Sequence, residues 1–419
     1  MKYNFLTSPS FFTEDFVKIN FDVFKDKNIL IGICGSIAAY KVLDLIRMLT
    51  KEGANLKAVL TQEAKNYIPL YTLAAFTKNK VYTDFSSSLE GEIPHIDLAN
   101  WADAFLIAPA TANTISKIAC GIADNLLTNI ALVLGKGLIA PAMNTNMYLN
   151  PFFQENLKKV SKHFKIIEVQ EGKLACGEEG KGKLAKLEQI YWELKSYLLP
   201  KPFENKLVLI STGPTKEYID PIRFISNDSS GKLGYHLAHI FASLGAKVVL
   251  VSGVDFKDQI YLSNINFFYT PTTQKMFETL KKHIEKADIF ISAAAVSDFK
   301  VENFSKKKIK KKKELTLKLK ENIDILKTLS KNKKQNQIFV GFSLETNDIL
   351  KHAQEKLMKK NLDLIIANYY KGMGKDKLYN VIFLSKDGIL KEFKEISKEN
   401  FAVELVNCLL NFKTLNNIS

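Results

Sequence analysis

The sequence has few cysteines and no long hydrophobic run, and each absence excludes a class of protein. The cysteines in its 419 residues are Cys34, Cys120, Cys176 and Cys408. No two of them lie close together, so we expect neither a disulfide framework nor a cysteine-based metal cluster, and a reducing cytoplasm is the expected compartment. No apolar stretch reaches the roughly 18 residues that span a bilayer. The amino-terminal segment carries Glu14 and Asp15 where a secretory signal would be apolar, so neither export nor membrane insertion is expected.

Length, composition and charge indicate a globular protein with more than one domain. At about one to two hundred residues per domain, 419 residues predict two or three domains. Hydrophobic residues make up 46% and charged residues 25%, which excludes global disorder. The net charge of +15 is concentrated in Lys300–Lys334, which alone contributes +10. That segment has one phenylalanine and no arginine, whereas nucleic-acid-binding surfaces usually interleave aromatics or arginines, so no nucleic-acid partner is expected.

Short apolar runs alternate with amphipathic segments in the first half of the chain. An apolar run at 28–33 ends in a glycine turn and is followed by an amphipathic pattern at 37–51. Further runs predict strands at 56–60, 103–108 and 137–140, and further patterns predict helices at 111–119, 125–134 and 187–199. Strands that alternate with helices predict a parallel sheet that is covered on both faces.

The second half repeats this pattern after a break at 198–205, where Pro200 and Pro202 lie among polar residues. It predicts strands at 207–211, 247–252, 288–292, 338–342 and 362–367, helices at 232–244, 274–286 and 348–360, and a terminal hairpin around Asp387 and Gly388. The chain is therefore predicted to be an α/β protein with two tandem, doubly wound (Rossmann-like) domains. The predicted division is an extension at 1–26, a first domain at 27–199, a linker at 200–206 and a second domain at 207–419.

Polar turns follow three strands of the first predicted domain, at the sheet edge where ligands of such folds bind. Gly35 and Ser36 begin a helix, and their free N–H groups and hydroxyl fit either phosphate binding or a plain helix cap. The turns PATANT at 109–114 and PAMN at 141–144 follow two further strands.

Five motifs carry a resemblance to a known family. They are, in chain order, GSIAAYK, HIDLANWAD, APATANTISKIACGIADNLL, PAMNTNM and LACGEEGKG. They resemble flavoprotein decarboxylases that act on cysteine-derived carboxylates. With the second half included, the chain from Lys27 to Leu410 resembles the bifunctional phosphopantothenoylcysteine decarboxylase/phosphopantothenate–cysteine ligases of bacterial coenzyme A biosynthesis. The resemblance implies an N-terminal flavoprotein domain and a C-terminal CTP-dependent ligase domain.

For the first domain, the resemblance implies bound FMN and decarboxylation of 4′-phosphopantothenoylcysteine to 4′-phosphopantetheine. The positions that match cofactor contacts are Gly35, Ser36, Ile37, Thr61, Thr111 and Asn113. His95 matches a base that is needed while the substrate thiol is oxidised, and Asn144 matches the residue that holds the substrate carboxylate. Cys176 matches the residue that protonates the enethiolate.

Other interpretations of the histidine and the cysteines follow from their surroundings alone. Without its motif, His95 would be interpreted as a histidine at a helix start, stacked on Trp101. The glycines around Cys176 are typical of a mobile flap. Cys34, Cys120 and Cys408 lie in apolar or helical segments and are assigned to packing.

The second domain lacks a standard P-loop, because no Ser or Thr follows Lys232 and Gly213 is too distant. Ser229, Ser230 and Gly231 at a helix start nevertheless form an anion site. The resemblance implies that CTP and Mg²⁺ activate 4′-phosphopantothenate as an acyl-cytidylate, which cysteine then attacks. Lys308 matches a lysine that stabilises departing pyrophosphate, and Asn227 matches a residue of the acyl-cytidylate step. The positions that match CTP contacts are Ser292, Ala293, Ala294, Asp298, Lys308, Asp324, Ile325, Phe342, Lys356 and Lys360, and Asp298 also matches the metal ligand.

The chain departs from the family pattern in two places. Asn322, Ile323 and Asp324 replace Asn-Pro-Asp, which is expected to loosen the turn and keep its carboxylate. The run Lys306–Lys313 is more basic than the family needs, and most of it is interpreted as a solvated segment.

The resemblance also implies a cytoplasmic homo-oligomer, in which trimers of flavin domains are linked by dimers of ligase domains. Arg223 lies in the segment that forms the dimer. An alternative function is a flavin-binding regulatory subunit that has lost catalysis. The joint presence of His95, Asn144, Cys176 and Lys308 argues against it.

Overall fold

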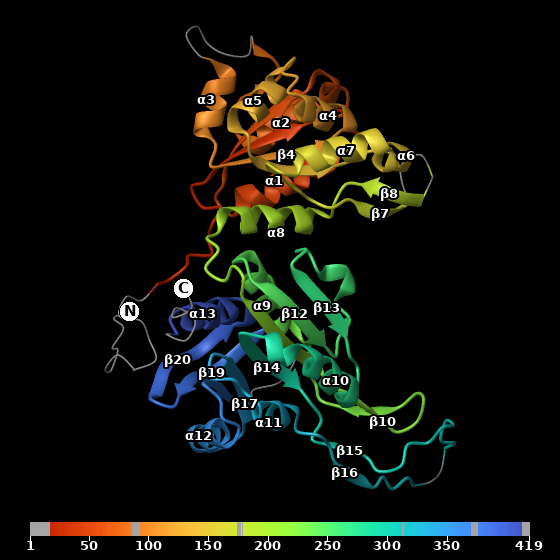
Figure 1. Ribbon diagram of the computed structural model, residues 1–419, viewed down its shortest axis with the longest axis vertical. Helices are drawn as coiled ribbons and strands as arrows, with labels where there is room; N and C mark the ends of the chain where they lie inside the picture. The colour runs from red at the N-terminus through yellow and green to blue at the C-terminus, as the bar shows by residue number, and fades with distance from the viewer. Residues whose placement is uncertain are drawn as a thin grey trace. The chain divides into compact units, whose positions relative to one another are not determined.

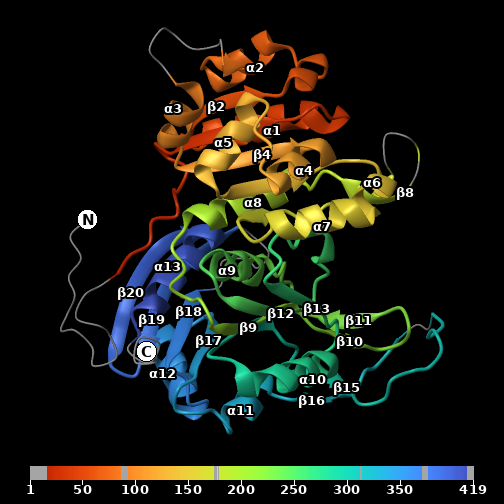
Figure 2. The same cartoon turned by 45° about the horizontal axis from the view of Figure 1, so that its top comes forward.

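A computed structural model describes residues 17–85, 93–173, 177, 179–311, 314–369 and 376–412 of the chain. The chain divides into two compact units (Figures 1 and 2). The first unit is Asn20–Leu199, and the second runs from Pro200 onward and includes Val17–Ile19. Within the described ranges, no helix is both long and apolar enough to cross a membrane.

The first unit is built on a six-stranded sheet. Its strands are β1 (Asn28–Ile33), β2 (Asn55–Leu60), β3 (Val81–Tyr82), β4 (Ala104–Ala110), β5 (Gly137–Pro141) and β6 (Phe164–Ile166). Their order in the sheet is β3-β2-β1-β4-β5-β6, and all pairs are parallel. The order reverses between β1 and β4, which is where ligands of doubly wound sheets bind.

Helices cover both faces of this sheet, which explains its continuous apolar strands. Successive residues of a strand point to opposite faces, so Ile29 and Ile31 contact one core while Leu30 contacts the other. The first core includes Phe24 and the helices α1 (Val42–Lys51), α2 (Leu70–Thr77) and α8 (Leu187–Leu198). The second core is closed by α3 (Pro94–Trp101), α4 (Ala112–Cys120), α5 (Leu126–Leu134) and α7 (Pro151–Val160). The remaining elements of the unit are the 3-10 helices η1 (Ile37–Lys41) and η2 (Gln62–Asn66), α6 (Thr145–Leu149), and the strands β7 (Gln170–Lys173) and β8 (Glu179–Lys183).

The second unit has an eight-stranded mixed sheet. Its strands are β9 (Leu207–Pro214), β12 (Lys247–Ser252), β13 (Ile265–Tyr269), β14 (Ile289–Ala295), β17 (Ile338–Glu345), β18 (Leu364–Tyr369), β19 (Lys377–Ser385) and β20 (Gly388–Ser397). The order β13-β12-β9-β14-β17-β18 repeats the topology of the first sheet with parallel pairs. The predicted hairpin adds β19 and β20 as antiparallel edge strands. The two sheets confirm the predicted fold class.

Helices also cover both faces of the second sheet. One core contains side chains of α10 (Thr273–His283), α11 (Ile325–Ser330) and α12 (Ile349–Lys359). On the other face lie α9 (Lys232–Ser243) and α13 (Lys398–Leu410), which pack against each other (Figure 2). The predicted terminal hairpin is therefore not the last element, because α13 follows it. Smaller elements are η4 (Lys257–Gln259), η5 (Ile284–Lys286) and two short hairpins, β10 (Lys216–Tyr218) with β11 (Phe224–Ser226) and β15 (Phe299–Val301) with β16 (Leu319–Glu321).

Two asparagines, Asn407 in α13 and Asn411 directly after it, form hydrogen bonds with the start of the described chain. Asn407 Oδ1 accepts the N–H of Ile19 (2.9 Å), and its Nδ2 donates to the carbonyl of Ile19 (3.3 Å). Asn411 pairs in the same way with Val17, at 2.7 and 2.9 Å. Residues four apart share a helix face, so the two amides act together as a partner for extended backbone.

The assignment of the cysteines to packing is wrong for one of them. Cys34 and Cys408 are buried, and burial raises the pKa of both thiols, to about 12 for Cys408. Cys120 is exposed instead. It lies two residues beyond the buried Ile118 on α4, a rotation of about 200° that turns it away from the core.

Candidate functional site

The first unit brings its predicted cofactor residues to one edge of the sheet. Gly35 and Ser36 follow β1, Thr61 follows β2, and Thr111 follows β4. Backbone hydrogen bonds join these strand ends, from Thr61 N to the carbonyl of Ile33 (3.0 Å) and from Cys34 N to the carbonyl of Pro109 (3.1 Å). The parallel register therefore places three polar turns side by side at the point where the strand order reverses.

The polar side chains at this edge differ in whether they already form hydrogen bonds within the protein. The Ser36 hydroxyl accepts the N–H of Ala38 (3.3 Å), so it does act as a helix cap. The side chains of Thr61 and Asn113 make no hydrogen bond with any residue that the structure describes. Ile37 is 61% exposed, a large apolar side chain beside open polar groups. This combination suits a ligand with both an anionic and a flat apolar part.

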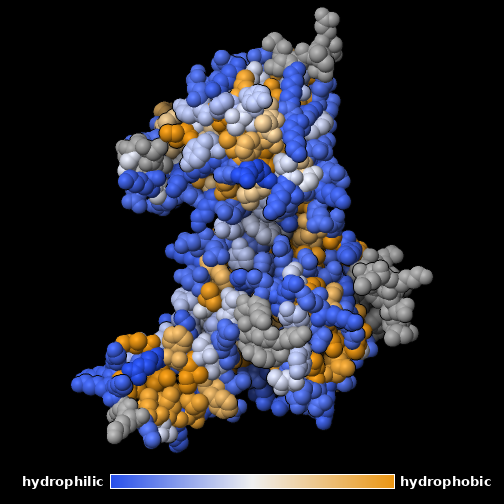
Figure 3. Space-filling model, turned by 180° about the vertical axis from the view of Figure 1, so that it is seen from behind, coloured by the Kyte–Doolittle hydropathy of each residue, from blue (hydrophilic) through white to orange (hydrophobic). Residues whose placement is uncertain are grey.

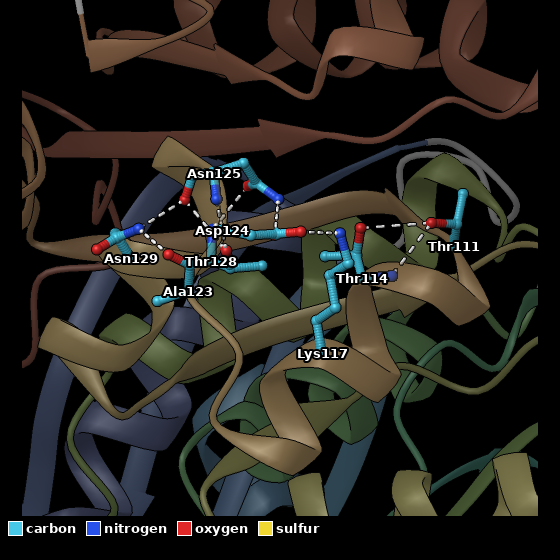
Figure 4. Close-up of polar contacts among 8 residues, drawn as sticks. All are labelled: Thr111, Thr114, Lys117, Ala123, Asp124, Asn125, Thr128 and Asn129. Carbon is cyan, nitrogen blue, oxygen red and sulfur yellow. Dashed lines mark hydrogen bonds and ion pairs between the residues drawn. The ribbon is translucent and has the colours of Figure 1, made fainter.

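A hydrogen-bond network ties the turn after β4 to the helix pair α4 and α5 (Figure 4). The Thr111 hydroxyl accepts the N–H of Thr114 (3.4 Å), and the Cys34 thiol donates to the Thr114 hydroxyl (3.2 Å). Lys117 pairs with Asp124 at 2.5 Å across the connection between the helices. Asn125 and Thr128 form a reciprocal capping box at the start of α5, and Asn129 donates to the carbonyls of Ala123 and Asn125. The motif ISKIACGIADNLL thus holds the cofactor-side turn in place.

Asn144 begins α6, directly after β5. Its Oδ1 accepts the N–H of Asn146 (2.8 Å), and the preceding Met143 donates its N–H to the carbonyl of Gly182 in β8 (2.9 Å). A Cβ at Gly182 would lie 2.4 Å from the carbonyl oxygen of Met143, so only glycine allows this approach. The β7–β8 hairpin therefore packs against the Asn144 turn. Cys176, between these two strands, lies outside the described residues.

His95 is the second residue of α3, which packs on α5. Its ring meets Phe85 edge to face, with centroids 5.9 Å apart, so stacking on Trp101 is not what the structure shows. Its Nδ1 is buried and has no hydrogen-bond partner within the described part of the chain. The Thr145 hydroxyl, next to Asn144, is in the same state. Buried polar atoms without partners are unfavourable, and both atoms lack a compensating hydrogen bond within the described residues.

The second unit contains a cavity of about 560 Å³ at the carboxyl ends of β9, β14 and β17. Most of the predicted nucleotide contacts line it, and Asn227 does too: they are Ser292, Ala293, Ala294, Asp298, Asp324, Ile325, Phe342, Lys356 and Lys360. The structure thereby brings together residues from β14, α11, β17 and α12. Lys308 is exposed on the connection between β15 and β16 and is not among the lining residues.

The cavity carries a cluster of opposite charges. Lys360 Nζ lies 2.8 Å from Asp324 Oδ2, and Lys356 Nζ donates to the carbonyl of Phe342 (2.7 Å). Burial acts to raise the pKa of Asp324, but hydrogen bonds from Lys360 and from the N–H of Lys327 outweigh it and lower the pKa. Burial is the main cause that lowers the pKa of Lys356, followed by the charge of Lys360.

Hydrogen bonds fix the turn before α11, although it lacks the proline of the family pattern. Asn322 donates its N–H to the carbonyl of Asp298 (2.8 Å) and its Nδ2 to the carbonyl of Ser297 (3.1 Å). The N–H of Ile323, which a proline would lack, donates to Asn322 Oδ1 (3.0 Å). The carboxylate of Asp324 caps α11 through the N–H of Lys327 (2.9 Å).

The described residues contain no group of three or more His, Cys, Asp or Glu side chains placed to hold a metal. Asp298 and Asp324 nevertheless line the same cavity. Mg²⁺ in nucleotide sites commonly takes one or two carboxylates and completes its shell with phosphate oxygens and water. The donor set therefore fits a magnesium ion that arrives with a nucleotide.

Asp220 connects the two short hairpins near Lys308. Its buried carboxylate accepts the N–H groups of Ile222 and Arg223 (both 2.8 Å) and of Ile309 (3.1 Å). Arg223 Nη2 in turn donates to the carbonyl of Ile309 (2.5 Å). The hydrogen bond from Ile222 is the largest cause that lowers the pKa of Asp220. A carboxylate whose pKa is lowered in the folded protein stabilises the fold at pH values above its pKa in the unfolded chain, which is about 3.9 for aspartate.

The contribution of Asp220 to stability is expected to depend on pH. Asp220→Asn should lower the free energy of unfolding at pH 7, and this loss should shrink at pH 3, because the wild-type carboxylate is lost as the pH falls through its lowered pKa. Denaturant unfolding of both proteins at the two pH values measures the difference. Asp255→Asn, an exposed carboxylate in the same unit, is the control. An equal loss at both pH values would contradict the prediction.

The sequence analysis did not identify several residues that line the cavity of the second unit. Lys398, Lys377, Tyr369 and Tyr379 come from the last strands and from α13, far along the chain from the motifs. One signal was available for Lys398. It follows the helix cap Ser397 directly, and a lysine in the first turn opposes the helix dipole.

Two family models match successive parts of the chain. The family model "Flavoprotein" matches residues 22–198, and the model "DNA/pantothenate metabolism flavoprotein C-terminal domain" matches residues 203–412. The coenzyme A biosynthesis bifunctional protein CoaBC of Borreliella burgdorferi is 40% identical over 391 residues, 92% of this chain and 99% of that protein. The Bacillus subtilis protein of the same name is 41% identical over 392 residues, 91% of this chain and 96% of that one.

A solved structure of the C-terminal domain of such a bifunctional protein is also similar. It is 31% identical, covers 50% of this chain and 96% of that one, and has a TM-score of 0.42. The assignment rests on the sequence relatives, which match over almost their whole length. The chain belongs to the family of bifunctional enzymes of coenzyme A biosynthesis.

Proposed function

We propose that the second unit joins cysteine to 4′-phosphopantothenate with CTP, and that the first unit decarboxylates the product to 4′-phosphopantetheine. The observation that carries the proposal is the position of the matched residues. Most of the matched residues that the structure describes follow the carboxyl ends of parallel strands in their own unit, in a chain that belongs to this family. The reducing cytoplasm is the compartment we propose, since the buried thiols of Cys34 and Cys408 need no oxidised partner.

FMN is the proposed cofactor of the first unit, in line with the "Flavoprotein" match. Its phosphate would meet the helix start at Gly35 and Ser36, and its ring the exposed side chain of Ile37. When bound, FMN supplies an acceptor for the electrons of thiol oxidation and a source for their return. His95 takes the thiol proton, the Asn144 amide orients the carboxylate, and Cys176 protonates the enethiolate.

CTP is the proposed co-substrate of the second unit. The amino groups of Lys356 and Lys360 provide positive charge for its phosphates, and Asp298 holds the accompanying Mg²⁺. Asn227 lies at the same cavity and fixes its amide by donating to the carbonyls of Ala295 and Val296 (3.2 and 3.1 Å). That amide is thus oriented for the acyl-cytidylate step.

We also propose a homo-oligomer, with dimers formed through the second unit and trimers through the first. Figure 3 shows apolar surface gathered on the arm that carries the two short hairpins. The exposed apolar side chains there are Ile222, Phe224, Phe299, Phe304, Leu315, Leu317 and Leu319. In the first unit, Tyr71 is 87% exposed and Phe152 79% exposed. Large exposed apolar patches mark interaction sites.

The purified full chain is expected to be yellow and to release carbon dioxide only when CTP, cysteine and 4′-phosphopantothenate are all supplied. A fragment that ends at Leu199 is expected to keep the flavin, and to decarboxylate presynthesised 4′-phosphopantothenoylcysteine without CTP, because each unit has its own core. Absorbance near the flavin maximum and trapped carbon dioxide measure both results.

Two outcomes would contradict parts of this proposal. The full chain could be yellow and yet release no carbon dioxide, either from the three ligase substrates together or from 4′-phosphopantothenoylcysteine. That result would favour the alternative function, a flavin-binding regulatory subunit without catalysis. A colourless or insoluble fragment, beside an active full chain, would show that the first unit does not fold alone.

A further inference from the structure

The end of α13 carries a surface that binds extended backbone. A side-chain amide offers one acceptor and one donor group, the same pair that a neighbouring strand offers to a peptide. Asn407 uses both groups on Ile19, and Asn411 uses both on Val17. The segment Val17–Ile19 (the docked segment) therefore lies across both amides. Both asparagines are only 1% exposed, and a buried amide that loses its partners is costly, so the surface favours an occupied state.

The side chains of the docked segment also contact this surface. Ile19 is buried, whereas Val17 is exposed. Between them, Lys18 pairs with Glu404 of α13 at 3.7 Å, and Glu404 also pairs with Lys391 of β20. Lys18 and Lys391 thus share one carboxylate. Backbone hydrogen bonds, an apolar side chain and an ion pair together identify this segment as the occupant.

The same helix reaches the cavity of the second unit at its other end. Lys398, the first residue of α13, lines the cavity. One turn later, the fully buried Phe401 contacts the rings of Phe342 on β17 and Phe383 on β19, with centroids 6.0 and 5.4 Å apart. Phe342 lines the same cavity. The position of α13 therefore affects the shape of the cavity.

The docked segment is far along the chain from the rest of the second unit. Val17–Ile19 belongs to the second unit, the following residues Asn20–Leu199 form the first unit, and the chain returns to the second unit at Pro200. The second unit is thus discontinuous in sequence. Residues that directly precede the flavin unit should therefore matter to the other unit.

We propose that Asn407 and Asn411 form a docking surface for Val17–Ile19, and that the docked segment holds α13 in the position that the ligase reaction needs. The effect on activity rests on the proposed ligase function, whereas the docking does not. The inference predicts a separation of effects along the chain. Loss of residues beside the flavin unit should weaken the ligase unit and leave the flavin unit intact.

A chain that begins at Asn20 tests the docking. Hydrogen exchange of α13 should be faster than in the full chain by about tenfold or more, because its two amides lose their partners. CTP-dependent pyrophosphate release should fall by about threefold or more, since α13 is less firmly held. Thermal unfolding of the first unit should not change. Both tryptophans, Trp101 and Trp192, lie in that unit, so tryptophan fluorescence and flavin release report on it alone.

The matched control is a chain that begins at Val17. It keeps the docked segment and should show the exchange, the pyrophosphate release and the unfolding of the full chain. Equal effects of the two truncations would show that Val17–Ile19 does not carry the contact.

Substitutions on α13 test the docking surface without a truncation. Asn407→Leu together with Asn411→Leu should reproduce the faster exchange, and this double variant covers the case in which the truncated chain does not fold. Asn400→Leu changes an exposed asparagine of the same helix and should behave as wild type. In the chain that begins at Asn20, the two leucines should cause little further loss, because the partners of both asparagines are already absent.

Substitutions in the docked segment test the other side of the contact. Ile19→Asp in the full chain places a charge at a buried position, so it should release the segment and speed the exchange of α13. Val17→Asp places the same charge at an exposed position and should leave the exchange unchanged.

Three results would overturn the docking. They are unchanged exchange of α13 in the chain that begins at Asn20, a lower unfolding temperature of the first unit in that chain, and equal effects of Asn400→Leu and the double variant. Faster exchange with normal pyrophosphate release would refute the effect on the ligase site. A full chain that shows the expected exchange but never consumes CTP would instead contradict the proposed ligase reaction and leave the docking surface intact.

Discussion

Replacement of His95 by asparagine is expected to slow decarboxylation of 4′-phosphopantothenoylcysteine by about 10²–10⁴-fold, the range for loss of a general base. Asparagine keeps a polar group at the buried position and lacks a ring nitrogen that can accept the thiol proton. Ligase activity of the same preparation should be unchanged, because His95 belongs to the first unit. Trapped carbon dioxide and anaerobic bleaching of the flavin absorbance measure the effect.

His163→Asn is the matched control, because this histidine is exposed in the same unit. It should leave both activities at the wild-type level, and both variants should keep the flavin. Normal bleaching of the flavin in His95→Asn would show that the histidine is not the base. The buried Nδ1 without a partner would then need another explanation.

Lys308→Gln is expected to slow CTP-dependent pyrophosphate release by about a hundredfold, or about 2.7 kcal/mol of transition-state stabilisation. Asp220 and Arg223 hold the adjacent Ile309 through its N–H and carbonyl, so Lys308 lies beside a fixed point in an otherwise exposed segment. Because Lys308 does not line the cavity, its action requires this segment to approach the phosphates when the nucleotide binds.

The control variant Lys311→Gln tests whether the position of Lys308 matters, and not only its charge. It removes the same charge three residues further along the exposed segment, and exposed neighbouring lysines are screened and interchangeable. Pyrophosphate release should therefore stay close to wild type in this variant at two salt concentrations. Equal and salt-sensitive losses in both variants would mean that the segment acts only through diffuse charge.

The central strands of both sheets were predictable because they are buried on both faces, whereas β3, β6 and β13 at the sheet edges were not predicted. Apolar runs such as Ile29–Ile33 and Val208–Ile210 identify β1 and β9, and the residues just after them identify the polar edge of each sheet. The hairpins β10–β11 and β15–β16 were not predicted. Their strands have three residues each, and the buried carboxylate of Asp220 fixes the neighbouring turn. No local pattern carries that information.

The sequence analysis also missed α13 and the cavity residue Lys398 at its start, for a different reason from that for the two short hairpins. Every residue of α13 from Leu405 to Leu410 is buried, so the polar face that identifies an amphipathic helix is absent there. The cavity residues from β14, α11 and α12 were found through their motifs, whereas Lys398 reaches Ser230 only through the packing of α13 on α9. Cys120 was misassigned because its neighbours in sequence are apolar, although its direction on α4 is outward.

The hydrogen bonds of Asn407 and Asn411 with Ile19 and Val17 have a consequence for synthesis of the chain. Ile19 leaves the ribosome 388 residues before the asparagine that binds it. At about 5–20 residues per second, its backbone groups wait about 20–80 s for their partner. The first unit can complete its core in that interval, since Asn20–Leu199 contains all of its strands. The earliest described residues of the chain are thus among the last to find their native contacts.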